Sequence, residues 1–436
     1  MTAPESPGDV ESPRRALATV VAVVFVDMLG FGIIVPILPF YVRSFGVSDV
    51  YIGLLAASYS LLQFAFAPVL GRLSDERGRR PVLLLSIGGS VVAWTLFGLA
   101  WSVGVLFVAR MFAGAMGGNI AAAQAYVADV TPAEERAAGL GLVGAAFGLG
   151  FVFGPAVGGV FASDPVVSAA RDVLPGVVPA TRFSLPSFAA AAFSLVNVGF
   201  AAAFLEETGT PSDAPTGESP VAGLLASLRN ADLRGLVTAF LLLSVAFSGV
   251  QVMFIPFAAD AYGYGASETA LLLTYVGVLG VLVQGVLVGR LSRRYGDVRL
   301  AFAGSALLAV ALAAIPFAPV LGRALVPPPG GPDFLTPELV ALLAVLPLLS
   351  AGNGLLTVSL TTLVSTSTGR ETQGTAFGVT QGAGSLGRTV GPPVMAALYA
   401  VVGRWSPFVV GAVLLLPVVA LAFARLRAGR QVVTNR

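Results

Sequence analysis

The chain contains no cysteine, no histidine and no lysine, and only 11% of its 436 residues are charged. Without cysteine and histidine it has no disulfide, no thiol nucleophile, no imidazole-based catalytic triad and no metal site built on those ligands. Without lysine it has no Walker-type nucleotide motif, because that motif requires a lysine beside its glycine. We therefore expect neither an enzyme nor a metal or cofactor site. The net charge of +2, with no basic domain, gives no reason to expect a nucleic-acid partner.

Apolar residues are the dominant feature, at 56% of the chain, and the mean hydropathy is +0.87. A soluble core cannot bury so large an apolar fraction, so lipid must be the solvent. The apolar residues form about twelve blocks of roughly 20 residues or more, the length that an α-helix needs to cross a ~30 Å hydrocarbon layer. The predicted spans are residues 16–40, 50–70, 81–101, 105–128, 137–162, 185–205, 235–258, 268–288, 300–321, 338–362, 374–400 and 406–424.

The arginines predict the orientation of these spans. With the amino terminus in the cytoplasm, eighteen of the 25 basic residues fall in cytoplasmic segments. The arginines expected outside are Arg43, Arg171, Arg182, Arg323 and Arg404. This asymmetry follows the positive-inside rule. We expect a multi-pass protein of the cell membrane with cytoplasmic tails at residues 1–15 and 425–436, the first of them a polar tail and not a cleaved signal.

The sequence also indicates two similar halves. Residues 206–234 form a long polar cytoplasmic segment, rich in Pro, Ser, Thr and acidic residues, which predicts a linker between six-helix bundles at 16–205 and 235–424. GRLSDERG at 71–78 recurs as GRLSRRYG at 289–296, each after the second span of its half. Duplicated halves are typical of secondary transporters. The predicted fold class is an all-α polytopic membrane protein with twelve transmembrane helices in two six-helix pseudo-symmetric bundles.

Three motifs resemble those of the major facilitator superfamily, over nearly the whole chain. The loop motif G-x-x-x-D-x-x-G-R-R is present as Gly71, Asp75, Gly78, Arg79 and Arg80. The fourth-span motif is matched by Arg110, Gly114, Gly117 and Gly118. The fifth-span motif, associated in the family with antiporters, is complete as Gly150, Gly154, Pro155, Gly158 and Gly159. Two positions depart from the pattern, because Glu76 replaces a basic residue and Ala113 a common glutamine.

The first span, VDMLGFGIIVPILPFY at residues 26–41, resembles that of the drug:proton antiporters that include the tetracycline exporters. The resemblance places the membrane-embedded aspartate of that branch at Asp27. Asp27 follows Arg15 by about twelve residues, hence roughly 18 Å along a helix, near the bilayer centre. A carboxylate there suits a proton carrier or a partner for a cationic substrate, because desolvation favours its neutral form. The alternative is a structural hydrogen bond to a neighbouring helix.

Two arginines fall inside predicted spans, and each must find a partner there. The resemblance implies that Arg110 faces the cavity and tunes the protonation of Asp27; the alternative is that it reaches the outer surface. Arg388 precedes the Gly-Pro pair of the eleventh span, and it is a candidate contact for substrate or for a helix-end carbonyl.

The cytoplasmic turn after the second span is predicted to act as a conformational latch. In the family its aspartate caps or pairs with a helix of the opposite half in one state and releases it in the other. Asp129 and Arg136 are candidate members of the same cluster as Asp75, Arg79 and Arg80. The alternative is a solvated turn that only sets topology.

Small and polar residues within spans complete the candidates. Glycines at four-residue spacing, with Pro155, predict a kinked and tightly packed fifth span that prevents leak through the empty carrier, with generic packing as the alternative. Polar side chains inside spans are expected to face the bundle interior, where they either line the substrate cavity or link two helices. These residues are Gln63, Asn119, Gln124, Gln251 and Gln284.

Taken together, the sequence predicts a secondary active transporter that exports lipophilic or cationic drug-like molecules in exchange for protons by alternating access. The expected partners are a small-molecule substrate, protons and the lipid bilayer, with the protein as a monomer. The alternative within transport is a proton symporter or uniporter for a metabolite such as a sugar or an organic acid. A lipid-modifying enzyme would require a nucleophile and base or a metal cage, and no such cluster is visible.

Overall fold

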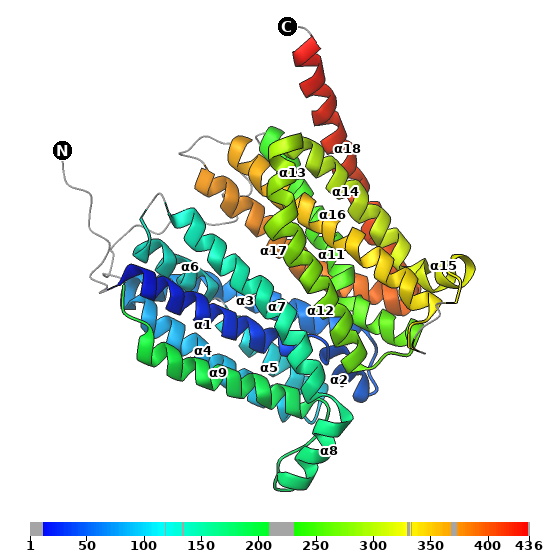
Figure 1. The fold of residues 1–436 in the computed structure, drawn as a ribbon. Helices are drawn as coiled ribbons and strands as arrows, with labels where there is room; N and C mark the ends of the chain where they lie inside the picture. The colour runs from blue at the N-terminus through cyan, green and yellow to red at the C-terminus, as the bar shows by residue number, and fades with distance from the viewer. Residues whose placement is uncertain are drawn as a thin grey trace, which may run out of the picture. The chain divides into compact units, whose positions relative to one another are not determined.

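The computed structural model describes residues 12–117, 119–132, 135–208, 231–328, 332, 334–367 and 373–434. All regular elements in these ranges are helices (Figure 1). In the described residues these elements form eleven helical stretches that are long and apolar enough to cross a membrane, and four of the stretches join two or three elements. Helix α17 (Gln373–Val401) is not among the eleven, because Gly, Ser, Thr, Pro and Arg388 lower its hydropathy. Its 29 residues nevertheless span about 43 Å, more than a bilayer core. The predicted all-α fold of twelve membrane helices is confirmed.

Contacts between Cα atoms divide the chain into two compact units, which are described separately here. Unit 1 comprises Met1–Val47, Ser58–Pro215 and Gly265–Gly277, and unit 2 comprises Ser48–Ala57, Thr216–Tyr264 and Val278–Arg436. The helices of the first half are α1 (Pro13–Ile34), α2 (Leu38–Ser44), α3 (Val50–Arg77), α4 (Arg79–Gly98), α5 (Val103–Met116), α6 (Asn119–Val130), α7 (Arg136–Phe161), α8 (Asp164–Val173) and α9 (Ser184–Phe204).

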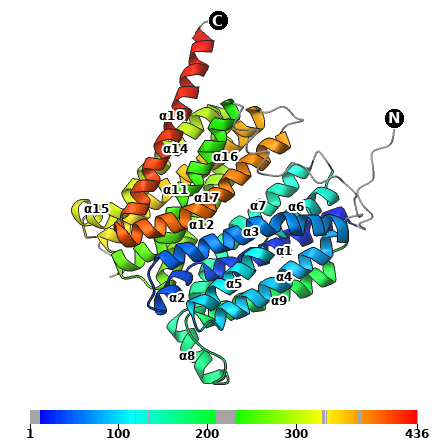
Figure 2. The same ribbon diagram turned by 180° about the vertical axis from the view of Figure 1, so that it is seen from behind.

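The helices after the linker are α11 (Ala231–Tyr262), α12 (Ala266–Leu282), η1 (Val283–Leu287), α13 (Val288–Tyr295), α14 (Asp297–Ala314), η2 (Ile315–Phe317), α15 (Ala318–Leu325), α16 (Pro337–Ser367), α17 and α18 (Ser406–Thr434). Within unit 2, α14 packs against α16 and α18, and α11 packs against α17. The last turns of α18 extend beyond these neighbours (Figure 2).

Several predicted spans are interrupted. The first span breaks into α1 and α2 around Pro36, because proline cannot donate the next helical hydrogen bond. The fourth span breaks after Met116 into α5 and α6, the eighth contains the π-helical turn η1, and the ninth contains the 3-10 turn η2 at Pro316. Hydropathy detects the length of an apolar block, whereas such breaks depend on local backbone geometry.

An extra helix, α8, lies in the loop at residues 163–184, where the sequence predicted only a connection. The Arg182 guanidinium forms an ion pair with Asp164 at 2.9 Å, and Arg171 Nε donates to the Ala180 carbonyl at 3.0 Å. These contacts fold the loop back on itself. Both ion-pair partners are exposed, so the pair adds little to stability.

Helix α1 lies at the centre of unit 1. It packs against α7 on one side and against α9 on the other, and α9 in turn packs against α4 (Figures 1 and 2). A buried apolar cluster fills the space between α1, α4, α6 and α9, with Val20, Ile87, Tyr126 and Ala201 all fully buried. This central position brings the side chains of α1 within reach of polar groups on three other helices.

Candidate functional site

Asp27 is half-buried on α1 and faces α4. The hydroxyl of Ser90, on α4, donates to Asp27 Oδ1 at 3.4 Å. A cavity of about 10 Å³ lies against the carboxylate, and its other walls are apolar side chains of α1, α4 and α6. Such a space is about the size of one water molecule. The structure therefore holds this carboxylate among the helices α1, α4 and α6, beside a space of about that size.

Polar groups line the interface of α1, α4 and α9 above and below this carboxylate. Asn197 Nδ2 donates to the Val23 carbonyl at 2.9 Å. At the other end, a Cβ added to Gly30 would lie 3.5 Å from Ser194 Oγ and 3.6 Å from Trp94 Nε1. The Ser194 and Asn197 side chains are buried. The interior around Asp27 is thus polar toward α9 and apolar toward α6.

Arg110 is buried, with 6% of its surface exposed. Its guanidinium carbon lies 4.7 Å from the ring centroid of Tyr59 and 5.4 Å from that of Phe31. Two cation–π contacts therefore stabilise a charge that a dry interior would otherwise disfavour. Tyr59 interacts electrostatically with both Arg110 and Asp27. Of the predicted coupling pair, Arg110 thus lies directly against Tyr59.

Tyr59 was not among the predicted site residues, although the fourth-span motif makes room for it. A Cβ on Gly117 would lie 2.7 Å from Tyr59 Oη, and a Cβ on Gly114 would overlap the Tyr59 backbone. Gln63 Nε2 donates to the Gly117 carbonyl at 3.0 Å and to Tyr59 Oη at 3.4 Å. Gln63 therefore links two helices, α3 and α5. The glycines of the fourth-span motif indicated that another helix packs closely there, but they did not indicate which residue of that helix would lie there.

Four of the other candidates for the substrate cavity have exposed side chains. The exposed side chains are Gln124, Gln251, Gln284 and Arg388. Gln284 lies in the π-helical turn η1, a kind of turn that is frequent at functional sites. Arg388 Nη2 donates to Ser385 Oγ at 2.9 Å, one turn earlier in α17. The side chain of Asn119 lies outside the described residues.

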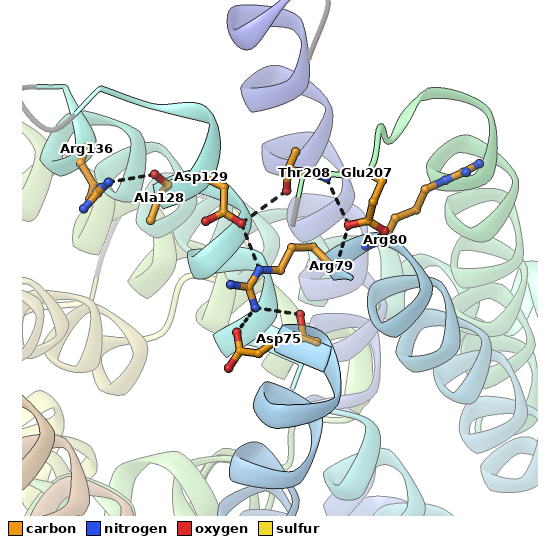
Figure 3. A network of polar contacts seen from close by, with 9 residues as sticks. Asp75, Arg79, Arg80, Ala128, Asp129, Arg136, Glu207 and Thr208 are labelled. Atoms are coloured by element: carbon orange, nitrogen blue, oxygen red, sulfur yellow. Dashed lines mark hydrogen bonds and ion pairs between the residues drawn. The ribbon is translucent and has the colours of Figure 1, made fainter. Parts of the chain in front are cut away.

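The turn between α3 and α4, which the sequence predicts to be cytoplasmic, forms a charge network around Arg79 (Figure 3). Arg79 Nε pairs with Asp129 of α6 at 3.0 Å, and its Nη1 pairs with Asp75 of α3 and donates to Ser74 Oγ at 3.3 Å. The guanidinium side chain is 15% exposed. Asp75, Arg79 and Asp129, predicted as parts of one cluster, are thus in direct contact. All of these contacts lie within unit 1.

The remaining predicted latch residues lie around this network. Arg80 Nη2 donates to the Ala202 carbonyl at 2.6 Å, and Arg136 Nη2 donates to the Ala128 carbonyl at 3.0 Å. Gly71 lies inside α3, where an added Cβ would meet open space. Packing in the structure therefore does not require glycine at that position.

Glu207 is a member of the network that the sequence did not indicate, since it falls in the predicted linker. Its carboxylate accepts the backbone N–H of Arg79 at 2.7 Å and that of Arg80 at 3.2 Å (Figure 3). The neighbouring Thr208 hydroxyl donates to Asp129 Oδ2 at 3.4 Å. Gly78 allows this approach, because it has a φ of +97° and an added Cβ would lie 2.5 Å from Glu207 Oε2.

The fifth-span motif packs α7 directly against α1. A Cβ on Gly154 would lie 2.6 Å from the Cα of Gly32, so the two backbones touch. Gly150 and Gly158, one turn to either side of Gly154, face α1 equally closely. Small residues at this spacing are what close helix packing in a membrane requires.

The other two residues of that motif lie on the same helix with different surroundings. Pro155 is inside α7, where it cannot donate a helical hydrogen bond. Gly159 faces α12: an added Cβ would lie 2.8 Å from the Cβ of Ala270, and the Ser267 hydroxyl donates to the Gly159 carbonyl at 3.1 Å. Both of these α12 residues belong to unit 1.

Asp260 lies at the end of α11, inside the candidate span Leu233–Tyr262. The Tyr399 hydroxyl donates to its Oδ2 at 2.6 Å, and Arg404 Nη1 donates to its backbone carbonyl at 3.0 Å. The sequence prediction ended this span at residue 258, so it placed Asp260 outside.

Curated proteins resemble the chain over nearly its full length. The class C tetracycline resistance protein of Escherichia coli is 29% identical over 412 residues, 92% of this chain and 95% of that protein. The class G protein of Vibrio anguillarum is 30% identical over 424 residues, 94% and 98% of the two chains. Multidrug resistance protein 1 of Bacillus subtilis (strain 168) is 26% identical over 397 residues, 89% and 91%.

Solved structures share the fold. The human organic anion transporter MFSD10 (TETRAN) superposes with a TM-score of 0.63 at 24% identity and covers 95% of this chain and 100% of its own. A bacterial homolog to the human lysosomal transporter Spinster, inward-facing and occupied, gives 0.74 at 16% identity, with 96% and 98% covered. The family model described as Major Facilitator Superfamily matches residues 20–327. The resemblance inferred from three motifs is thereby confirmed, and the chain belongs to the Major Facilitator Superfamily.

Proposed function

We propose that the protein exports lipophilic or cationic drug-like molecules from the cytoplasm in exchange for protons. The observation that carries this proposal is the placement of Asp27 among the helices of unit 1, bonded to Ser90, in the same unit as the buried Arg110 that lies against Tyr59. The full-length relatives named tetracycline and multidrug resistance proteins support a drug as substrate. The chain is a carrier and not an enzyme.

In this mechanism Asp27 alternates between a protonated and an ionised form. Ionised, it is neutralised by the positive field of Arg110 or by a cationic substrate; protonated, it is a neutral partner for the Ser90 hydroxyl. The fixed charge of Arg110, held between two aromatic rings, favours release of the proton. Binding of drug and of proton thus exclude one another, as exchange requires.

The driving force suffices without a nucleotide. One proton that moves down a potential of ~100 mV releases ~2.3 kcal/mol, and one pH unit adds ~1.4 kcal/mol. Together these terms support a drug gradient of roughly 500-fold. Arg79, with Asp75 and Asp129, acts as the latch at the cytoplasmic end.

The proposed topology follows from the arginine distribution. Both termini are cytoplasmic, the protein is a monomer in the cell membrane, and two six-helix halves, 16–205 and 235–424, are joined by the linker at 206–234. Alternating access of these halves then exposes the site to either side.

The test is drug-dependent proton flux in vesicles that have the cytoplasmic face outward and an acidic lumen. Tetracycline-like, cationic and neutral drugs are added outside, and the lumenal pH is followed. We expect lumenal alkalinisation with the wild type and with Asp172→Asn, an exposed acid of α8, but not with Asp27→Asn. No response to any drug, together with uptake of a sugar or organic acid by folded protein, would replace export by metabolite transport.

A further inference from the structure

The helix α4 begins with two cations, which is unfavourable for a helix start. Its first residues are Arg79 and Arg80, and its first turn contains no acid. The amino end of a helix carries unpaired N–H groups and a partial positive charge, so an acid is the favoured residue there. Some other group must therefore balance this helix end.

The second half of the chain shows the same turn with a local solution. Gly296, with a φ of +79°, precedes α14 as Gly78 precedes α4, and the next residue is Asp297. The Ser292 hydroxyl donates to Asp297 Oδ1 at 2.7 Å. In the repeat, Asp297 is the counterpart of Arg79. The first half thus has an arginine at the position where the second half has an acid in the first turn of the helix.

Glu207 supplies the missing acid from 128 residues further along the chain. Both of its carboxylate oxygens accept backbone N–H groups of the first turn of α4, at 2.7 and 3.2 Å. The first turn is then held while the Arg79 side chain reaches past it to Asp75 and Asp129 (Figure 3). Thr208 attaches the same segment to Asp129.

We propose that Glu207 is a positioning residue of the cytoplasmic latch. By capping α4 from outside, it frees position 79 for an arginine that joins α3 to α6. It also ties the residues that follow α9, Glu207 and Thr208, to the network around that arginine. Of the two measurements that test this inference, only the second, which measures transport, rests on the proposed function.

The first measurement is amide hydrogen exchange in the full-length protein, which requires no substrate. We compare Glu207→Gln with Glu207→Asp and with Glu76→Gln, an exposed acid on the same turn. Loss of the charged acceptor is expected to speed exchange about tenfold in the peptide that spans residues 78–83. The Glu76→Gln control is expected to leave exchange unchanged, and Glu207→Asp is expected to fall between. Unchanged exchange in Glu207→Gln overturns the proposal.

The second measurement is a double-mutant cycle on maximal transport rate. If Glu207 acts by holding Arg79 in place, Glu207→Gln and Asp129→Asn release the same side chain, and the double variant is no slower than the slower single variant. The matched cycle of Glu76→Gln with Asp129→Asn is expected to be multiplicative. Multiplicative losses in the Glu207 cycle would show a helix cap without a positioning role, and would overturn the proposal. If the carrier moves a metabolite and not a drug, the cycle is measured on that metabolite, so failure of the proposed function leaves this test intact.

Discussion

The substitution Gly154→Ala places one methyl group where the backbones of α1 and α7 touch. The new Cβ would lie 2.6 Å from Gly32 Cα and 3.0 Å from Ile33 N, whereas ordinary contact begins at 3.4 Å. Both neighbours are backbone atoms, so neither can rotate away. The two helices must separate locally by at least 0.8 Å, the difference between 2.6 and 3.4 Å.

The magnitude follows from the contacts that this separation weakens. A gap of 0.5–1 Å costs a quarter to a half of each dispersion contact, and with a few tens of atom pairs at ~0.1–0.2 kcal/mol the loss is about 1–2 kcal/mol. Overpacked sites generally lose about 1–3 kcal/mol. Alanine recovers up to ~1 kcal/mol through its better helix propensity. We therefore expect a net destabilisation of up to about 2 kcal/mol.

The matched control is Gly144→Ala, in the same helix, where an added Cβ meets nothing within 4 Å. It gains the propensity term without the overlap, so we expect its stability to be unchanged or raised by up to ~1 kcal/mol. The assay is the apparent unfolding temperature of purified protein, followed by the fluorescence of its three tryptophans at one fixed scan rate. We expect Gly154→Ala to unfold at a temperature up to about 2 °C below that of the wild type.

Equal unfolding temperatures for Gly154→Ala and Gly144→Ala would refute the contact of the two backbones. A functional measurement accompanies the stability assay. If the packing of α1 on α7 also seals the empty carrier, vesicles with Gly154→Ala leak protons without drug, and vesicles with Gly144→Ala do not.

Three further outcomes follow from the described contacts. Arg110→Lys, which loses the planar stacking on Tyr59, is expected to lower drug-dependent proton flux at least tenfold, with normal expression measured alongside; full activity would contradict the cation–π assignment. Asp129→Asn removes one of the two acids that hold the Arg79 side chain. Because the ion pair is partly exposed, we expect the free energy of unfolding to fall by only about 1 kcal/mol, whereas the transport rate falls several-fold. A loss of stability with an unchanged transport rate would argue against a latch. Gly78→Ala forces a φ of +97° on a residue with a Cβ, so it is expected to destabilise by about 1–2 kcal/mol, and a stability equal to the wild type would contradict the turn.

The sequence predicted the fold class because bilayer insertion is governed by composition over short segments. Runs of about 20 apolar residues, with arginines between them, indicate membrane helices whatever their neighbours are. The same local character made the glycines of the fifth span informative: Gly150, Gly154 and Gly158 share one helix face by spacing alone. The sequence also made Asp27 a candidate site residue, because a carboxylate inside a membrane span is energetically costly and needs a partner there.

Side-chain partners were less accessible to sequence reasoning. Tyr59 is one of nine tyrosines, and nothing in its neighbourhood distinguishes it until α3 and α5 come together at Gly114 and Gly117. From the sequence, Gln63 was expected either to line the substrate cavity or to link two helices. Only the structure shows its hydrogen bond to the Gly117 carbonyl, which links α3 to α5. Helix breaks such as that at Gly117 were missed, because hydropathy averages over them.

The sequence by itself determined that this chain is a bundle of membrane helices with an acid inside its first span, a glycine-lined helix face in its fifth span and a charged turn after its second span. These properties depend on residues close together in the chain. Only the tertiary structure decided which groups meet: Glu207 on the first turn of α4, and Arg110 on the ring of Tyr59. These contacts join segments that are far apart in the sequence. They depend on how the surfaces of two segments fit together, and the sequence of one segment does not specify the surface of the other.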